Sequence, residues 1–277
     1  MKQVTLPGGE RVPVLGQGTW HIGDDASTRS EEIATLQEGL DLRLSLIDTA
    51  EMYGEGAAEE LVGKAIAGRR DAAFLVSKVY PHNASRRGVI AACERSLARL
   101  GTDRIDLYLL HWRGSVPLAE TIAGFEDLKA AGKIRHFGVS NLDTRDMREW
   151  WATAGGKSVA TNQILYNLTR RGPEWDLLPW LAERRIPVMA YSPIEQAALL
   201  DHAGLVAFAR EHAMTPAQAA LAWLMRRDDV IVIPKTGRRT RLRENAAARE
   251  IVLDHAQLAA LDRLFPPPRK ARRLEML

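Results

Sequence analysis

The chain has 277 residues, of which 46% are hydrophobic and 26% are charged, as is usual for a soluble globular protein. The net charge of +3 is weak support for a nucleic-acid partner. The sequence has no run of about 18 apolar residues, so we expect no membrane span. A single cysteine, Cys93, excludes a disulfide within the chain and suits a reducing compartment. We therefore expect a cytoplasmic protein that binds neither nucleic acid nor a membrane, and we expect a monomer because nothing in the sequence demands more.

Short apolar runs alternate with amphipathic segments along most of the chain. A hairpin is predicted first, with residues 4–6 and 12–14 on either side of the turn Pro7-Gly8-Gly9. Strands follow near residue 15 and at 44–48, 73–78, 105–111, 134–141, 161–163, 187–191 and 230–234. Helices are predicted at 30–42, 57–67, 86–100, 117–131, 144–154, 174–184, 203–211, 216–227, 240–248 and 256–264.

Eight strands that alternate with helices indicate right-handed βαβ units and a parallel sheet. At this length they favour an α/β fold of one domain, a (β/α)8 TIM barrel over residues 1–277. An open doubly wound sheet is the alternative. The glycines at 16, 18 and 23 lack the Gly-x-Gly-x-x-Gly spacing, so we reject a Rossmann dinucleotide loop.

Polar side chains stand where the apolar runs stop. They are Asp48, Lys78, His111, Ser140, Asn141, Gln163, Tyr191 and Lys235. In a barrel these strand ends meet at one rim, where barrel active sites lie. No group of His, Cys, Asp and Glu has the spacing of metal ligands, so we predict no metal.

Four residues near this rim suit a site that donates a proton to a carbonyl oxygen. Tyr53 is the candidate acid, and a Lys78 ammonium is expected to lower its pKa. Asp48 can hold Lys78, and His111 can donate a hydrogen bond to the substrate oxygen. None of them is a hydride source, so a reductase would need a nicotinamide cofactor. From the residues alone, Lys78 could instead form a rim salt bridge or a Schiff base, and His111 could be a core histidine.

The second half of the chain offers ligand-binding groups. Donors and acceptors suited to a carboxamide come from Ser140, Asn141 and Gln163, and Tyr191 offers a face for a flat ring. Near the last strand, cations and a hydroxyl gather at the start of a helix: Lys235, Thr236, Arg238 and Arg241. They predict a phosphate site, with a merely basic surface helix as the alternative.

Several motifs together resemble those of the aldo-keto reductases. They are Asp48-Thr-Ala-Glu-Met-Tyr53, Val76-Ser-Lys78, Asp106-Leu-Tyr-Leu-Leu-His111-Trp112, Gly138-Val-Ser-Asn141, Ala190-Tyr-Ser-Pro193, Ile233-Pro-Lys235 and Arg241-Leu-Arg-Glu244-Asn245. The match runs in order along essentially the whole chain. The sequence most resembles bacterial members of this family that are described as methylglyoxal or 2-oxoaldehyde reductases.

The resemblance implies a barrel closed at its bottom by the N-terminal hairpin, and NADPH-dependent reduction of small aldehydes and ketones. It implies Asp48, Tyr53, Lys78 and His111 as catalytic residues, with Trp20 and Trp112 at the substrate. It implies NADPH contacts from Thr19, Trp20, Ser140, Asn141, Gln163, Tyr191, Ser192, Pro193, Ile194, Ile233, Lys235, Thr236, Arg241, Glu244 and Asn245.

Three departures and two alternatives accompany this resemblance. The family often has Ser after the lysine of Ile233-Pro-Lys235, where this chain has Thr236 and keeps the hydroxyl. The loop after Tyr191 lacks the glycines often found there, which argues against a mobile clasp over the pyrophosphate. The tail after Pro268 is short, so we expect it to cover little of the pocket. The alternatives are a cofactor-binding sensor with negligible turnover and a Schiff-base lyase built on Lys78.

Overall fold

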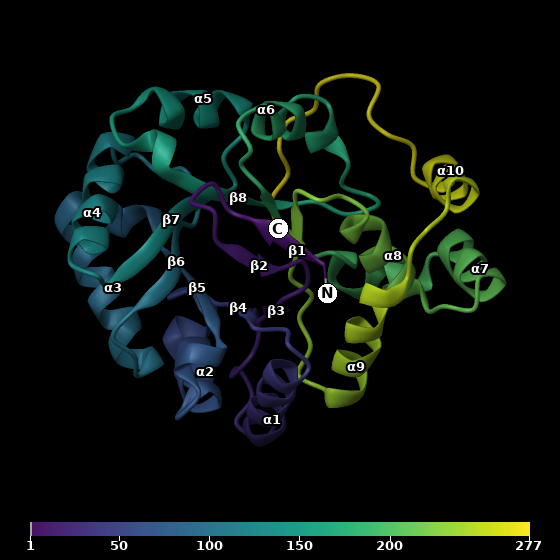
Figure 1. Cartoon of the computed structure of the whole chain (residues 1–277), viewed down its shortest axis with the longest axis horizontal. Helices are drawn as coiled ribbons and strands as arrows, with labels where there is room; N and C mark the ends of the chain where they lie inside the picture. Colours follow the sequence, from purple (N-terminus) through teal and green to yellow (C-terminus); the bar gives the residue numbers. More distant parts are fainter. Residues whose placement is uncertain (1) are drawn as a thin grey trace.

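A parallel sheet of eight strands forms the centre of the computed structural model, which describes residues 2–277 (Figure 1). In chain order the strands are β3 (Gln17–Gly18), β4 (Leu46–Asp48), β5 (Phe74–Val79), β6 (Ile105–Leu110), β7 (Ile134–Ser140), β8 (Val159–Leu165), β9 (Val188–Tyr191) and β10 (Val230–Val232). Each pairs with the next, and parallel bridges from Leu15 to Val232 and from Gly18 to Lys235 join the first to the last. The predicted (β/α)8 barrel is therefore confirmed, and the open sheet is rejected.

Helices surround the sheet in Figure 1. They are α1 (Arg29–Asp41), α2 (Ala57–Ile66), α3 (Arg86–Leu100), α4 (Leu118–Ala130), α5 (Thr144–Ala152), α6 (Leu177–Glu183), α7 (Ala203–Glu211), α8 (Pro216–Met225), α9 (Arg239–Ala247) and α10 (His255–Leu264). The largest differences from the predicted bounds are at β8, which is longer than 161–163, and at α6, which begins after a short 3₁₀ turn at Gly172–Glu174.

The central strands are buried on both faces, as their apolar sequences require. Every residue of β5 and β6 is buried, including Lys78, because helices cover the outside and side chains fill the inside. Local capping sets where the helices begin. Ser85 accepts a hydrogen bond from the amide of Gly88 at the start of α3, and Thr215 forms a capping box with Gln218 at the start of α8.

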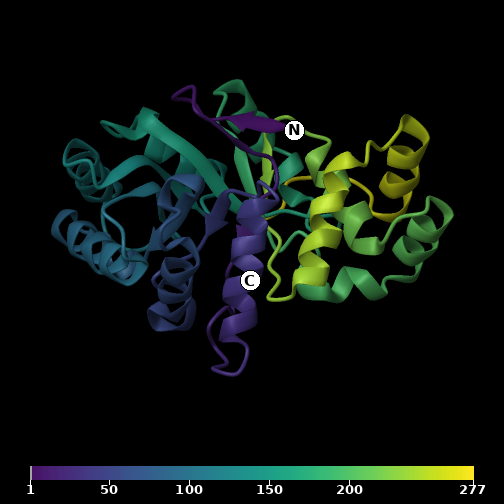
Figure 2. The same ribbon diagram turned by 60° about the horizontal axis from the view of Figure 1, so that its bottom comes forward.

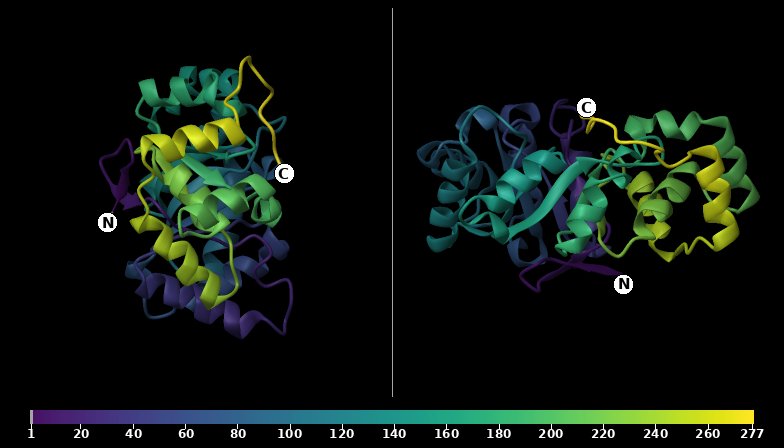
Figure 3. Two further views of the ribbon diagram at one scale, coloured as in Figure 1. Left: turned by 90° about the vertical axis from the view of Figure 1, so that its right-hand side faces the viewer. Right: turned by 90° about the horizontal axis from the view of Figure 1, so that it is seen from above.

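The N-terminal hairpin closes the end of the barrel opposite the polar rim. Its strands, β1 (Gln3–Thr5) and β2 (Arg11–Pro13), are antiparallel, and Val4 and Val12 are buried in the main core. His136 on β7 lies 2.6 Å from the Glu10 carboxylate of the hairpin. Figures 2 and 3 show the hairpin, in purple, at the end of the barrel away from the C-terminal residues. The predicted position of the hairpin is confirmed.

Candidate active site

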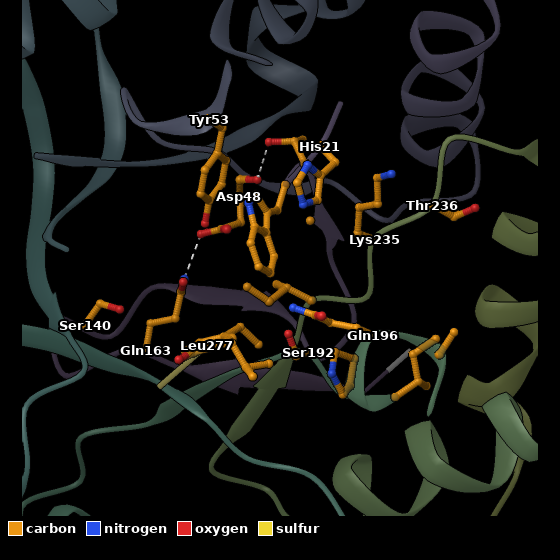
Figure 4. Close-up of a pocket in the computed structure, with 18 of the residues that line it drawn as sticks. His21, Asp48, Tyr53, Ser140, Gln163, Ser192, Gln196, Lys235, Thr236 and Leu277 are labelled. Atoms are coloured by element: carbon orange, nitrogen blue, oxygen red, sulfur yellow. Dashed lines mark hydrogen bonds between the residues drawn. The ribbon is translucent and has the colours of Figure 1, made fainter. Parts of the chain in front are cut away.

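A cavity of about 620 Å³ opens where the parallel strands end (Figure 4). Of the site residues expected from the sequence, nineteen line it: Thr19, Trp20, Asp48, Tyr53, His111, Trp112, Ser140, Asn141, Gln163, Tyr191, Ser192, Pro193, Ile194, Ile233, Lys235, Thr236, Arg241, Glu244 and Asn245. Lys78 does not line the cavity, because it is fully buried behind Asp48 and Tyr53. The sheet thus brings together residues that are far apart in the sequence.

The buried ammonium of Lys78 organises the innermost part of the cavity. Its Nζ donates hydrogen bonds to Asp48 Oδ2 at 2.8 Å, to the carbonyl oxygen of Thr49 at 2.8 Å and to the Tyr53 hydroxyl oxygen at 3.1 Å. An ammonium has three donors, so all of them are used. Because the Tyr53 oxygen accepts from Lys78, the hydrogen of its own hydroxyl is available for a ligand in the cavity.

The pKa of Tyr53 differs from the sequence-based expectation. Burial, and next the Asp48 carboxylate, raise the pKa of Tyr53 well above its ordinary value of 10.0. Burial lowers the pKa of the Lys78 ammonium, an effect that the Asp48 carboxylate opposes. The expectation that Lys78 lowers the pKa of Tyr53 is therefore wrong, because burial and the Asp48 carboxylate both act in the opposite direction. Tyr53 therefore keeps its proton at neutral pH.

His111 is neutral in this environment. Burial, followed by the charge of Lys78, lowers the pKa of His111 well below 6.5. Its Nδ1 is buried and has no hydrogen-bond partner among residues 2–277. A buried N–H without an acceptor is costly, so the ring hydrogen belongs on Nε2. The imidazole can therefore donate one hydrogen bond from Nε2, and its ring lies 5.9 Å from the Tyr53 ring.

Amide groups on the neighbouring strands are held in fixed orientations. Gln163 Nε2 donates to Asp48 Oδ1 at 2.7 Å (dashed in Figure 4), which leaves the side-chain oxygen of Gln163 as an acceptor. The Tyr191 hydroxyl donates to Asn141 Oδ1 at 3.0 Å, and Asn141 Nδ2 donates to Ser140 Oγ at 3.1 Å. Burial raises the pKa of Tyr191 to about 12, so this hydroxyl keeps its hydrogen.

The basic side chains of α9 fall into two groups. Arg239 pairs with Glu31 and Arg243 pairs with Glu38, which ties α9 to α1. Arg241 and Lys235 line the cavity, and neither forms an ion pair with any residue that the structure describes. Lys235 and Arg241, two cations without an ion-pair partner, suit an anionic ligand, whereas the charges of Arg239 and Arg243 are compensated by α1.

Some cavity residues were not expected from the sequence. They are Gly18, His21, Met52, Gln196, Ala197, Leu200, Ala217, Met276 and Leu277. His21 stacks on Trp20 with ring centroids 4.7 Å apart and lies 2.6 Å from Asp24. Its position directly after Trp20 was the available signal. For Met276 and Leu277, local patterns gave none.

The loop after β9 folds tightly although it has no glycine. Ser192, Glu195, Gln196 and Ala197 all have positive φ, between 47° and 77°. The loop is anchored by Glu195, which accepts hydrogen bonds from Asn167 Nδ2 at 2.6 Å and from Arg170 Nε at 2.8 Å. Polar contacts therefore impose a conformation that glycines would otherwise favour.

The C-terminal tail reaches the cavity, so the expectation that it covers little of the pocket is wrong. Arg170 Nη1 donates to Glu275 Oε1 at 2.6 Å, which fixes the tail beside the loop after β9. Met276 and Leu277 then line the cavity, and the right-hand view of Figure 3 shows the tail, in yellow, running back over the barrel. Arg170 and Glu275 are 105 residues apart in the sequence, so local patterns do not reveal their contact.

Within the described residues, the side chains form no metal site and the helices include no membrane span. Between residues 2 and 277, no three His, Cys, Asp or Glu side chains are grouped so that they could hold a metal ion. Over the same part of the chain, no helix is long and apolar enough to span a membrane.

Comparison with protein families and individual proteins identifies the family. The model of the aldo/keto reductase family matches residues 14–265. Methylglyoxal reductase YeaE of Escherichia coli K12 is 49% identical over 281 residues, which covers 100% of this chain and 99% of the relative. Methylglyoxal reductase DkgB of Escherichia coli O157:H7 is 31% identical, covering 91% of this chain and 93% of the relative.

Solved structures agree with this assignment. An aldo/keto reductase from Klebsiella pneumoniae in complex with NADP and acetate is 50% identical, with a TM-score of 0.97 over 100% of this chain and 99% of that chain. A second structure from the same organism, in complex with NADPH, matches to the same extent. The chain belongs to the aldo/keto reductase family, so the resemblance drawn from its motifs and the predicted class of oxidoreductase are confirmed.

Proposed function

We propose that this aldo/keto reductase uses NADPH to reduce small aldehydes and ketones to alcohols, with 2-oxoaldehydes such as methylglyoxal as candidate substrates. The observation that carries the proposal is the arrangement around Lys78: because Lys78 donates to the Tyr53 oxygen, the hydroxyl hydrogen of Tyr53 remains available for a ligand in the cavity. The two relatives described as methylglyoxal reductases support the choice of substrate. We also propose that residues 1–277 act as one domain and that the protein is a monomer, because the candidate site calls for no residue from a second copy. The single cysteine, Cys93, supports the cytoplasmic location that we propose.

The donor set of the cavity fits NADPH. The free oxygen of Gln163, with Ser140 and Asn141, suits the carboxamide, and the Tyr191 ring offers a stacking face. The unpaired Lys235 and Arg241, with Thr236, suit the 2′-phosphate, and Glu244 and Asn245 lie nearby for the adenosine. The remaining contacts we propose come from Thr19, Trp20, Ser192, Pro193, Ile194 and Ile233. When bound, NADPH supplies the hydride that none of these side chains can provide.

The protein's own residues orient the carbonyl and supply the proton. The His111 Nε2 hydrogen and the Tyr53 hydroxyl hydrogen would both bond the carbonyl oxygen, with Trp20 and Trp112 beside the rest of the substrate. As negative charge develops on that oxygen, the Tyr53 hydrogen moves to it. The phenolate left behind accepts a hydrogen bond from Lys78 at 3.1 Å, and Asp48 keeps Lys78 in place.

Replacing Tyr53 by Phe tests this proposal. With methylglyoxal and NADPH, Tyr53→Phe should lower kcat by about 10²–10⁴-fold because the proton donor is lost. NADPH binding, followed by quenching of tryptophan fluorescence, should change little. The matched control is Tyr108→Phe, which removes a buried hydroxyl that does not line the cavity.

Two results would contradict the proposal. Equal turnover by Tyr53→Phe and the wild-type protein would remove Tyr53 as the acid. Tight NADPH binding by the wild-type protein without turnover of any carbonyl would favour the sensor alternative. A lyase based on Lys78 is disfavoured because its Nζ is buried behind Tyr53 with all three donors in use.

A further inference from the structure

Glu51 lies two residues before Tyr53 and has no part in the chemistry proposed above. Its side chain is almost fully buried, with a residue exposure of 7%. Burying a carboxylate is costly unless hydrogen bonds compensate it, so its position calls for an explanation. We propose that Glu51 is a positioning residue, which fixes the loop that carries Tyr53 against the segment that follows Lys78.

The contacts of Glu51 join two loops at the rim. Its Oε1 accepts hydrogen bonds from the backbone N–H of Tyr80 at 2.8 Å and from Asn83 Nδ2 at 3.1 Å. Its own backbone N–H points to the carbonyl oxygen of Lys78 at 3.4 Å. The side chain of Arg95 is half-exposed, and its Nη2 lies 3.5 Å from Glu51 Oε2. Both short bonds converge on Oε1, so the oxygen acceptor matters more than the negative charge.

The loop needs such an anchor because its backbone is unusual. Directly after Tyr53, Gly54, Glu55 and Gly56 all have positive φ, from 53° to 100°. Beyond them Glu59 is fully buried and accepts a hydrogen bond from Ser77 Oγ at 2.6 Å. Tyr53 is thus held from both sides, by Glu51 before it and by Glu59 after it, and each carboxylate bonds to the chain next to Lys78.

The same contact supports one wall of the cavity. The ring of Tyr80, whose amide bonds Glu51, packs edge-on against the Trp112 ring with centroids 5.8 Å apart. Trp112 lines the cavity and lies 4.8 Å from the His111 ring. Losing Glu51 would therefore loosen both the proton donor and the residues that orient the carbonyl.

The inference rests on the proposed function, since it takes Tyr53 as the acid, and three variants test it. Glu51→Ala should lower kcat for methylglyoxal by about 10- to 100-fold, because small misplacements of a catalytic group are costly. The Kd for NADPH should stay within about twofold, because the cofactor residues are elsewhere. Glu51→Gln keeps an oxygen for Tyr80 and Asn83, so it should recover most of kcat. Glu55→Gln is the matched control, since Glu55 is exposed on the same loop.

A kcat for Glu51→Ala within about twofold of wild type would overturn the inference. So would a parallel loss of kcat, NADPH affinity and thermal stability, because that indicates a general defect. If Glu51→Ala does not fold, Asn83→Ala replaces it, because this variant removes one of the two donors to Glu51 Oε1. Asn83→Ala should lower kcat with unchanged NADPH affinity. A kcat equal to that of the wild-type protein would refute the positioning role of Glu51. Tyr53→Phe separates the two proposals. If it retains activity, the proposed function fails; if it loses activity while Glu51→Ala does not, only the role of Glu51 fails.

Discussion

The buried ion pair between Lys78 and Asp48 gives the sharpest test of how the centre of the site is held. Lys78 is 0% exposed and Asp48 is 2% exposed, and their charged atoms lie 2.8 Å apart. In Lys78→Met, Asp48 keeps one side-chain hydrogen bond, from Gln163 at 2.7 Å, and becomes a buried charge without a counter-ion. Breaking a buried pair in this way typically costs about 3–5 kcal/mol, and we expect that loss in the free energy of unfolding.

Removing the other partner should cost less. In Asp48→Asn, Lys78 retains its bonds to the Thr49 carbonyl and the Tyr53 hydroxyl, and it can release its proton because burial already lowers its pKa. We expect a loss of about 1–3 kcal/mol. The double variant has no buried charge at this position. Its loss should therefore fall short of the sum of the two single losses by about 1–3 kcal/mol.

Urea denaturation of the four proteins at neutral pH measures these energies, with Lys64→Met as a control on an exposed helix position. The comparison isolates the pair because each single variant removes one of its charges. Additivity of the two single losses within about 0.5 kcal/mol would refute the reasoning. So would a Lys78→Met protein that is no less stable than Lys64→Met, because the buried carboxylate would then cost nothing.

Two further predictions follow from unpaired and buried groups. Arg241→Ala should weaken NADPH binding about 10- to 100-fold and NADH binding far less, as measured by fluorescence titration, with the paired Arg243→Ala as control; equal losses for both cofactors would exclude a 2′-phosphate contact. Because the pKa of His111 in the folded protein lies well below 6.5, the unfolded chain takes up a proton there first as the pH falls, so the folded state loses stability below pH 6.5. In the wild-type protein this loss in the free energy of unfolding reaches about 1.4 kcal/mol per pH unit, and it should be absent in His111→Gln. If the free energies of unfolding of the two proteins change in parallel with pH, the prediction is wrong.

The sequence was informative wherever function depended on residues at strand ends. A (β/α)8 barrel brings such residues to one rim whatever the details of its loops, so Asp48, Lys78, His111 and Gln163 could be grouped before their distances were known. The family motifs added Tyr53, which is on a loop.

Features that depend on contacts between loops could not be predicted. The position of the tail follows from Arg170 and Glu275, and the shape of the loop after β9 follows from Glu195, neither of which shows in local composition. The pKa of Tyr53 was expected in the wrong direction because it depends first on burial and then on the nearby Asp48 carboxylate. The burial of Glu51 could not be predicted either, because the family motif that contains it assigns roles only to Asp48 and Tyr53.

The closure of the barrel itself has a consequence for ligand binding. The first and last strands, β3 and β10, are only two and three residues long, and their junction is a seam made by Leu15 with Val232 and Gly18 with Lys235. A side chain at Gly18 would come within 2.9 Å of the Ile233 carbonyl oxygen, so only glycine lets the edges meet. The cavity lies across this seam, with residues from both edges in its lining. A ligand in the cavity would therefore contact both edges of the sheet, and its binding to the folded protein would raise the free energy of unfolding of the closed barrel.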